Sequence, residues 1–308
     1  MKHHKQPQSA SELVAANYQE RLYKKNPRLV FMMKIIRLCF LILEYISPKL
    51  AGWWALRLWL ATRRYPLPAR EKIWLATATE SSLLHQNGSI KLYRWQTTQT
   101  TAPIVLLIHG WNGRGLQLGA FVKPLLEQGF QVISFDAPGH GSSPGNESNL
   151  FIIADVVQAI SKSVGSIHSI IAHSFGAMVM ARAVNDGLNI HNAVVISAPK
   201  NVEFLTNLFC AMFKIKPNSK KNLLERIKRR FGDTMFDKAS TINNLKKIAI
   251  PGLIVHDSHD EDIPVQHAQE LNAAWVNSEL LITENLGHLR ILRDKNIITS
   301  IVKFIANN

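Results

Sequence analysis

Uninterrupted runs of Val, Ile and Leu recur through the last two thirds of the chain, separated by segments of helical length. The apolar runs cover residues 104–108, 131–135, 169–172, 193–197, 252–256 and 279–283. Helical segments are expected at residues 116–128, 150–164, 175–186, 265–275 and 290–306. Strands without polar alternation are buried on both faces, and helices between them are typical of parallel crossovers. The pattern therefore predicts the α/β class, with a mostly parallel, doubly wound sheet and helices on both of its faces.

Two stretches depart from this alternation. Residues 73–79 and 89–95 alternate apolar and polar side chains around Asn87-Gly88, which predicts a β-hairpin before the parallel strands. Residues 201–247 are mainly helical in pattern and rich in Lys and Arg. Such an insertion is either a solvated helical surface or a helical cap over a binding site, and the pattern allows both.

The first 72 residues lie outside the alternating pattern and predict helices instead. Three helical segments are expected, at residues 11–24, 29–46 and 49–62. In the second segment, Lys34, Arg37 and Glu44 fall within a sector of about 80° on a helical wheel, which leaves a very wide apolar face. This segment has 18 residues, fewer than the ~20 of a membrane span, and its charges oppose insertion. Residues 1–72 are therefore predicted to be a basic tail followed by an amphipathic helical hairpin.

The charge of the chain is concentrated in this N-terminal region. The formal net charge is +14, and residues 1–72 hold 14 Lys and Arg against four Asp and Glu. Basic residues near Trp53, Trp54 and Trp59 suit an anionic membrane interface, where tryptophan rings lie among the head groups. The alternative is that the hairpin packs on the following domain and buries these tryptophans. Both alternatives stay open for residues 29–64.

The sequence lacks the signals of several other classes of protein. It contains neither a Walker A sequence nor G-x-G-x-x-G after a strand, so nucleotide binding is not expected, and no nucleic-acid partner is expected either. Cys39 and Cys210 lie too far apart for a metal or disulfide framework. No small-x-small cleavage site follows the apolar segment closely, so a secretory signal is not expected. These observations favour a cytoplasmic location. Peripheral attachment at the inner face of a membrane is the second location that the sequence allows.

A serine lies at the sharpest turn that the pattern predicts. In Ala172-His173-Ser174-Phe175-Gly176 an apolar strand runs into a turn of small residues, and a helix follows. Small neighbours allow a strained backbone that exposes the serine hydroxyl, as a nucleophile requires. A serine before a helix is also a common N-cap. Ala172 stands where glycine is commoner, so we expect an intact nucleophile in a slightly reshaped turn.

Polar and glycine-rich stretches follow the other buried strands, at the edge where a doubly wound sheet binds ligands. They are His109-Gly110-Trp111-Asn112-Gly113, Asp136-Ala137-Pro138-Gly139-His140-Gly141-Ser142-Ser143, the loop at residues 256–264, and Leu286-Gly287-His288. Together with the serine turn, and in this order, they resemble the α/β-hydrolase superfamily over about residues 104–305. The resemblance implies an α/β-hydrolase fold within residues 73–308, with a cap-like insertion at about residues 201–247 and no cofactor.

The resemblance also assigns a catalytic triad. Ser174 would attack a carbonyl carbon after His288 removes the proton of its hydroxyl. Asp260, four residues before Pro264 as in the family, would fix the tautomer of the imidazole. Asp257 and Asp262 are the competing carboxylates, and Asp257 is better suited to bracing the turn.

Further family positions complete the expected site. The backbone N–H groups of Trp111 and Phe175 would form the oxyanion hole that stabilises the tetrahedral intermediate. His109 and His140 match structural positions of the family, and the stretch of residues 136–143 matches a bracing turn. None of these is assigned to catalysis.

The loop after residues 252–256 is also rich in residue types that bind metals. They are His256, Asp257, His259, Asp260 and Asp262. Side chains so close together on one loop cannot all converge on one ion, and the loop lacks the Gly and distal Glu of a calcium hand. No metal is therefore expected.

The predicted function is hydrolysis of a carboxylic ester, or a related acyl compound, through an acyl-enzyme on Ser174. The expected substrate is a small acyl molecule. The alternative is a non-catalytic protein of the same fold that binds at a membrane surface.

Overall fold

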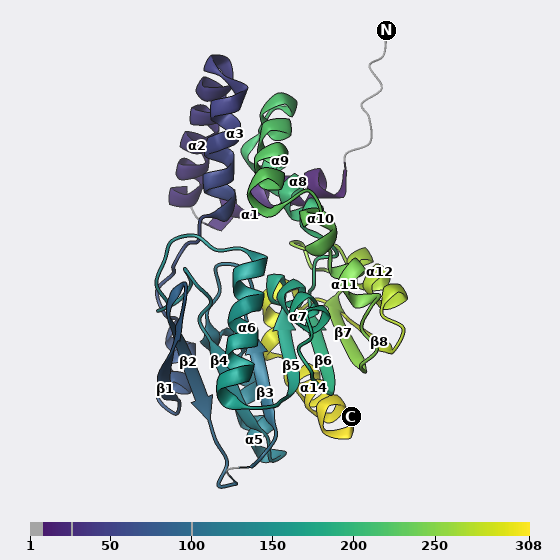
Figure 1. Cartoon of the computed structure of the whole chain (residues 1–308). Coiled ribbons are helices and arrows are strands. Elements are labelled where there is room, and N and C mark those ends of the chain that lie inside the picture. Colours follow the sequence, from purple (N-terminus) through teal and green to yellow (C-terminus); the bar gives the residue numbers. More distant parts are fainter. Residues whose placement is uncertain (1–8, 26, 100) are drawn as a thin grey trace.

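The computed structural model describes residues 9–25, 27–99 and 101–308, which build around one eight-stranded sheet (Figure 1). The strands stand in the order β1-β2-β4-β3-β5-β6-β7-β8. Their bounds are β1 Thr79–His85, β2 Gly88–Trp95, β3 Ile104–Ile108, β4 Gln131–Phe135, β5 Ile167–His173, β6 Asn192–Ile196, β7 Gly252–Asp257 and β8 Ser278–Thr283. The pairs β1–β2 and β2–β4 are antiparallel, and all the others are parallel. The predicted α/β class and mostly parallel sheet are confirmed.

Helices cover both faces of this sheet and continue beyond one of its ends. Their bounds are α1 Ala10–Lys25, α2 Pro27–Ile46, α3 Pro48–Leu60, α4 Lys72–Leu75, α5 Val122–Glu127, α6 Leu150–Val164, α7 Phe175–Asn185, α8 Val202–Phe213, α9 Pro217–Phe231, α10 Met235–Lys238, α11 Thr241–Leu245, α12 Gln266–Ala274, α13 Gly287–Arg290 and α14 Lys295–Asn307. On β3, Leu106 and Ile108 share a hydrophobic cluster with α6 and α7, whereas Val105 and Leu107 share one with α5 and α14. Because successive strand residues point to opposite faces, one apolar run contributes to two cores.

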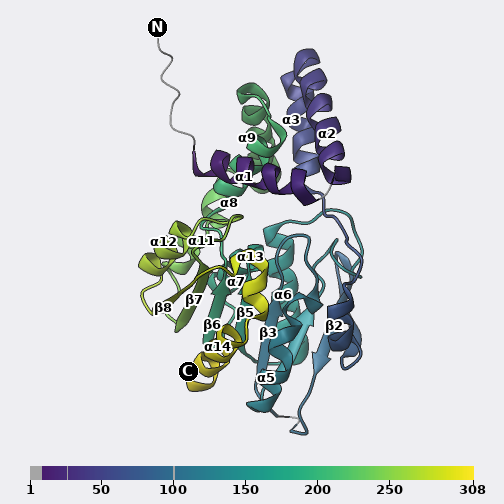
Figure 2. The same ribbon diagram turned by 180° about the vertical axis from the view of Figure 1, so that it is seen from behind.

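The N-terminal helices pack against the helices of the insertion. Helix α3 contacts α9, where Gly52 permits a close approach, since a Cβ there would lie 2.6 Å from Asn222 Cβ. Helix α1 contacts α8, and Val14 packs with Phe204 and Ile263. Figures 1 and 2 both show α2, α3 and α9 standing side by side, away from the sheet. One side of the hairpin is therefore buried against the insertion.

Two predicted element boundaries near the start of the sheet are wrong. Residues 73–78 form the end of α4 and a turn, and the first strand begins only at Thr79, so the hairpin is built from β1 and β2. Residues 116–128 form two helices, a 3-10 helix at Gly115–Phe121 and then α5. Pro124 lies in the first turn of α5, where its missing N–H removes no helical hydrogen bond.

The predicted closing helix at residues 290–306 is also wrong, because it is divided. Helix α13 and a short 3-10 helix at Ile291–Arg293 precede α14. Asp294, between the 3-10 helix and α14, leaves the helical conformation. Its Oδ1 accepts hydrogen bonds from the N–H groups of Asn296 and Ile297, at 3.0 and 3.1 Å. This N-cap starts a new helix and leaves His288 on a separate short turn.

Candidate active site

Ser174 occupies the turn between β5 and α7 in a conformation that few L residues adopt. Its φ is 52° and its ψ is −120°. A Cβ on Gly176 would lie only 2.6 Å from the Ile108 carbonyl oxygen, and one on Gly110 would lie 3.1 Å from Ser174 Cβ. The small residues are therefore a steric requirement of the turn. The Ser174 side chain makes no capping hydrogen bond to α7, so the structure does not use it as the N-cap that the sequence also allowed.

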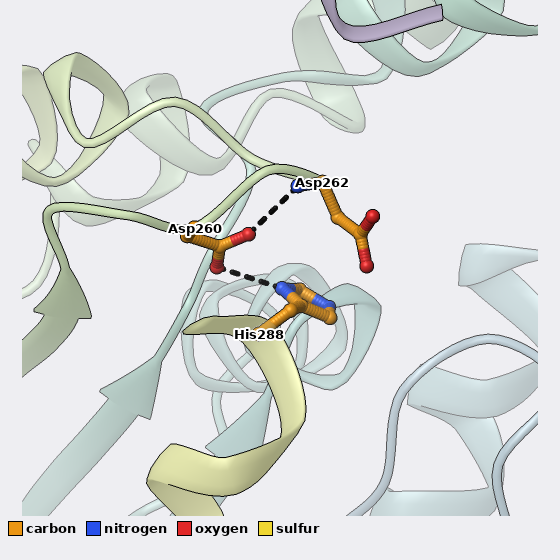
Figure 3. A group of neighbouring side chains, drawn as sticks. All are labelled: Asp260, Asp262 and His288. Carbon is orange, nitrogen blue, oxygen red and sulfur yellow. Dashed lines mark hydrogen bonds and ion pairs between the residues drawn. The ribbon is translucent and has the colours of Figure 1, made fainter. Parts of the chain in front are cut away.

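The side chains of Asp260 and His288 come from two separate segments of the chain and point toward one another (Figure 3). Asp260 lies after β7 and His288 lies in α13, and Nδ1 of the imidazole is 2.8 Å from Oδ2 of the carboxylate. The other oxygen of Asp260 accepts from the N–H groups of Asp262 and Ile263, at 2.9 and 3.0 Å. Burial opposes the charged carboxylate, but the hydrogen bond and charge of His288 and the N–H of Ile263 lower the pKa of Asp260 to about 2. The carboxylate is thus an ionised acceptor of fixed orientation.

Asp257, the first competitor for this position, is used elsewhere. Its carboxylate accepts hydrogen bonds from the His259 N–H at 3.0 Å, the Thr283 hydroxyl at 2.7 Å and the Leu286 N–H at 2.9 Å. Burial raises the pKa of Asp257, but these hydrogen bonds outweigh it and the net shift is downward. Asp257 therefore ties the end of β7 to the chain after β8, and Asp260 is the carboxylate that contacts His288.

Asp262, the second competitor, lies on the other side of the imidazole. Figure 3 shows its carboxylate beside the ring of His288, while Asp260 contacts Nδ1. One ligand atom from each of Asp260, Asp262 and His288 lies within 4.8 Å of the others, which is close enough for a cation. Both oxygens of Asp260 already accept hydrogen bonds within the protein, so a cation would have to compete with His288 for Oδ2. The donor set therefore fits a hydrogen-bonded acid–base pair better than a metal centre.

Two buried histidines support the backbone around Ser174. Nε2 of His173 donates to the carbonyl oxygen of His288 at 3.0 Å, which ties the end of β5 to α13. The Ala137 N–H donates to Nε2 of His109 at 3.0 Å, and Nδ1 of His109 then donates to the Gly110 carbonyl at 2.7 Å. Burial lowers the pKa of His109 to about 4 and that of His173 to about 3, so both rings are neutral near pH 7. The contact made by His173 was not foreseen, because the sequence gives no signal for a partner 115 residues away.

Two cavities meet at Ser174, and they differ in chemistry. The first has a volume of about 350 Å³, and mainly apolar side chains from α3, α8, α9 and α10 line it together with Ser174. Leu58 and Trp59 of α3 form part of its wall, a contribution of the N-terminal hairpin that the sequence did not predict. The second cavity, of about 440 Å³, is more polar and is lined by Ser174, His288 and Arg114, among others. Ser174 therefore has an apolar space on one side and a polar space containing His288 on the other.

The polar cavity also contains basic side chains that a buried acid holds in place. Glu71 is buried, and its carboxylate lies 3.5 Å from Nε of Arg114 and 3.8 Å from Nη2 of Arg70. Burial raises the pKa of Glu71, and the neighbouring guanidinium groups oppose this rise. Arg293 lines the same cavity. The polar space next to His288 thus carries both signs of charge.

Residues 105–298 match the sequence model of the alpha/beta hydrolase family. The matched range includes the parallel strands, the Ser174 turn, the helical insertion and the segments that hold Asp260 and His288. The chain belongs to this family. It is 23% identical over 245 residues to the AB hydrolase superfamily protein YisY of Bacillus subtilis (strain 168), covering 66% of this chain and 91% of that protein. The family model thus confirms the resemblance that the strand-end motifs indicated.

Solved structures show the same fold. A candidate lipase from Acinetobacter baumannii AYE superposes with a TM-score of 0.59 at 20% identity, covering 77% of this chain and 94% of that chain. An esterase from Exiguobacterium antarcticum gives a TM-score of 0.57 at 15% identity, covering 74% of this chain and 99% of that chain. At these identities the likeness establishes the α/β-hydrolase fold and leaves the chemistry to the residues of this chain.

The structure gathers the predicted site residues at one end of the parallel sheet. Asp260 and His288 are hydrogen-bonded, and Ser174 and His288 line the same cavity. Trp111 and Phe175 flank Ser174, with ring centroids 5.0 Å apart in an edge-on arrangement. The arrangement combines a strained serine, an imidazole and an ionised carboxylate.

Proposed function

We propose that the protein is a serine hydrolase that cleaves carboxylic esters through an acyl-enzyme on Ser174. The observation that carries the proposal is the 2.8 Å hydrogen bond between Asp260 and His288, in a cavity that Ser174 shares. With Nδ1 bound to Asp260, Nε2 is the nitrogen that would accept the proton of the Ser174 hydroxyl. Asp260 would then stabilise the imidazolium that forms. The same imidazolium would protonate the leaving alcohol, and water would cleave the acyl-enzyme by the reverse sequence of proton transfers.

The oxyanion of the tetrahedral intermediate would be met by backbone N–H groups. Phe175 is the first residue of α7, so its N–H belongs to the first turn, where helical N–H groups lack helical partners and the helix dipole is positive. Trp111 follows Gly110, which approaches Ser174 closely. We assign the two donors to Phe175 and Trp111, and one such donor contributes about 3 to 4 kcal/mol to transition-state stabilisation in serine hydrolases.

The two cavities indicate how a small acyl substrate would lie. The apolar cavity suits the acyl chain, because burying methylene groups there removes them from water at a gain of about 0.8 kcal/mol each. The polar cavity suits the leaving alcohol and the incoming water, because His288 lines it. The proposed substrate is therefore an ester of an apolar carboxylic acid.

Steady-state hydrolysis of a series of p-nitrophenyl esters tests this function. We expect turnover of at least one ester and a loss of about 10³-fold or more in kcat for His288→Ala. His259→Ala is the matched control, since His259 is a neighbouring loop histidine whose ring nitrogen contacts Ser258, and it should keep activity within a few-fold. Turnover that His288→Ala leaves unchanged would exclude the proposed base.

The alternative, a non-catalytic protein that binds at a membrane surface, makes the opposite prediction for this assay. It requires folded wild-type protein that turns over no ester of any chain length. Peripheral attachment to the inner face of a membrane through residues 29–64 is compatible with both functions and stays a prediction of its own.

A further inference from the structure

Helix α2 packs with two of its charged side chains inward. Glu44 is buried, and its Oε1 accepts a hydrogen bond of 2.6 Å from the backbone N–H of Lys216. Arg37 donates through Nε and Nη2 to the carbonyl of Met212, at 2.9 and 2.7 Å. These contacts join α2 to the end of α8 and the start of α9. Two of the three charges of the polar sector expected for this helix, Arg37 and Glu44, therefore make internal contacts, whereas Lys34 is exposed.

The outward side of α2 is mainly apolar as a consequence, with Lys34 exposed among its apolar side chains. Its exposed large side chains are Phe31, Met32, Ile35, Leu38, Leu41, Ile42, Tyr45 and Ile46, and Leu50 and Trp53 continue the surface on α3. Tyr45 is 91% exposed and Phe31 is 66% exposed. Elsewhere in the described part of the chain, exposed large apolar side chains are spread over separate elements. We call these ten residues the apolar face, and contiguous surfaces of this kind mark contacts with partners or membranes.

Basic residues border the apolar face. On α3, Lys49, Trp53 and Arg57 are all exposed and recur at four-residue intervals, so they form one row with the tryptophan between two cations. Arg28 is exposed at the start of α2. Helix α9, which packs on α3, has six Lys and Arg against one Glu in its sequence. Two copies of this face would bring like charges together, whereas an anionic surface would meet them with opposite charge.

We propose that the apolar face of α2 and α3 docks on an anionic phospholipid bilayer. The apolar side chains would enter the boundary between head groups and acyl chains, Trp53 and Tyr45 would lie at the head-group level, and Lys49 and Arg57 would contact lipid phosphates. In the proposed contact α2 would lie in the plane of the interface. Among the described residues, no helix has the length and apolar character of a membrane span. The proposal assigns the membrane contact to the outward apolar surface and its basic border. The sequence pattern alone did not distinguish this surface from the side of the hairpin that packs on the protein.

Docking would place the proposed substrate cavity next to lipid. Leu58 and Trp59 of α3 line the apolar cavity from the side of the same hairpin, and Met212, which binds Arg37 through its carbonyl, lines it from α8. An ester with a long acyl chain could then pass from the bilayer to Ser174 without crossing bulk water. This last step rests on the proposed hydrolase function, whereas docking itself does not require catalysis.

Flotation of the full chain with vesicles tests docking directly. Vesicles of phosphatidylcholine alone are compared with vesicles of phosphatidylcholine and phosphatidylglycerol. We expect wild type to float with the anionic vesicles, and Leu38→Asp with Tyr45→Asp to lower the bound-to-free ratio at least tenfold. The matched control is Leu84→Asp with Val276→Asp, which adds the same charges at positions 86% and 88% exposed, and it should bind like wild type. Wild-type protein that stays with the unbound fraction on anionic vesicles overturns the proposal.

A charge variant and a measurement without variants complete the test. Lys49→Gln with Arg57→Gln should lower anionic binding several-fold and leave the weak binding to phosphatidylcholine unchanged. Brominated phosphatidylcholine in anionic vesicles should quench wild-type tryptophan fluorescence, and no quenching contradicts docking.

Sedimentation velocity tests whether a second copy of the chain covers the apolar face instead of a membrane. A wild-type dimer that Leu38→Asp with Tyr45→Asp converts to monomer would assign the face to that second copy. Ser174→Ala should float like wild type, so failure of docking and failure of the hydrolase function are distinguishable.

Discussion

Nδ1 of His288 and Oδ2 of Asp260 lie 2.8 Å apart, although the two residues are 28 positions apart in the chain. The acceptor is itself fixed, since Oδ1 of Asp260 takes the N–H groups of Asp262 and Ile263. The orientation of the imidazole therefore depends on the geometry of the loop after β7.

Asp260→Asn should lower kcat on p-nitrophenyl butyrate by about 10²- to 10⁴-fold, because an amide can donate to Nδ1 and select the wrong tautomer of His288. Asp262→Asn is the matched control on the same loop and should stay within about tenfold of wild type. An Asp260→Asn enzyme with more than half of the wild-type kcat would remove Asp260 from the triad.

The backbone conformation of Ser174 predicts that the Ser174→Gly protein is more stable than the Ser174→Ala protein. With φ at 52° and ψ at −120°, a residue that has a Cβ is strained by about 1 to 3 kcal/mol, and glycine is not. Glycine has more conformational freedom in the unfolded chain, which lowers the stability of the folded protein by about 0.5 to 1 kcal/mol and offsets part of the relieved strain. The free energy of unfolding of Ser174→Gly should therefore exceed that of Ser174→Ala by about 1 kcal/mol. Urea denaturation measures the difference. A lower midpoint for Ser174→Gly than for Ser174→Ala would show that the turn is not strained.

Buried histidines predict a loss of stability in mild acid. Burial lowers the pKa of His109 to about 4 and the pKa values of His140, His173 and His267 to about 3. An unfolded histidine titrates near 6.5, so below that pH the unfolded chain takes up protons that the folded protein does not bind. The free energy of unfolding should therefore be highest above about pH 6.5 and fall steadily toward pH 4.

Urea midpoints at about pH 7 and pH 5 measure this loss. Asp260 does not interfere, because its lowered pKa stabilises the fold above about pH 4 and this contribution is lost only as the pH falls toward 2. His267→Gln should reduce the difference between the two midpoints. An equal or higher midpoint at pH 5 would mean that the imidazoles are protonated in the folded protein.

The apolar cavity predicts control over acyl-chain length. Leu205 lines it, and Leu205→Trp should fill part of its volume of about 350 Å³. The ratio of kcat/KM for a dodecanoyl ester to that for an acetyl ester should fall by about tenfold or more, because the long chain loses its space and the acetyl group does not. Leu289→Trp, on the wall of the polar cavity, is the control and should leave the ratio unchanged. An unchanged ratio in Leu205→Trp would place the acyl chain elsewhere.

The sheet and the site were predictable because both follow from short local patterns. The apolar run of β3 and its parallel neighbours determined the class, and every predicted site residue lies at the carboxyl end of a strand or at the helix that follows it. The choice of Asp260 over Asp257 came from a family spacing. The structure gives a physical reason, since the carboxylate of Asp257 is taken by Thr283 and two backbone N–H groups.

The orientation of the N-terminal helices could not be predicted in the same way. A helical wheel gives the sector that holds Arg37 and Glu44, but not whether this sector faces solvent or protein. Their partners are the carbonyl of Met212 and the N–H of Lys216, more than 170 residues away. Backbone groups carry no sequence signal, so neither the inward charges nor the wall that α3 adds to the cavity was visible before the fold was known.

Covalent labelling of Ser174 is the most direct test of the central claim. Wild-type protein is treated with a fluorophosphonate, and the adduct is counted and located by mass spectrometry of the intact chain and its peptides. Ser148→Ala is the control, because Ser148 lines the same apolar cavity. We predict one adduct per chain, on Ser174, in wild type and in Ser148→Ala, and none in Ser174→Ala. Folded wild-type protein that takes no label, or an adduct that persists in Ser174→Ala, would contradict a serine hydrolase with Ser174 as its nucleophile.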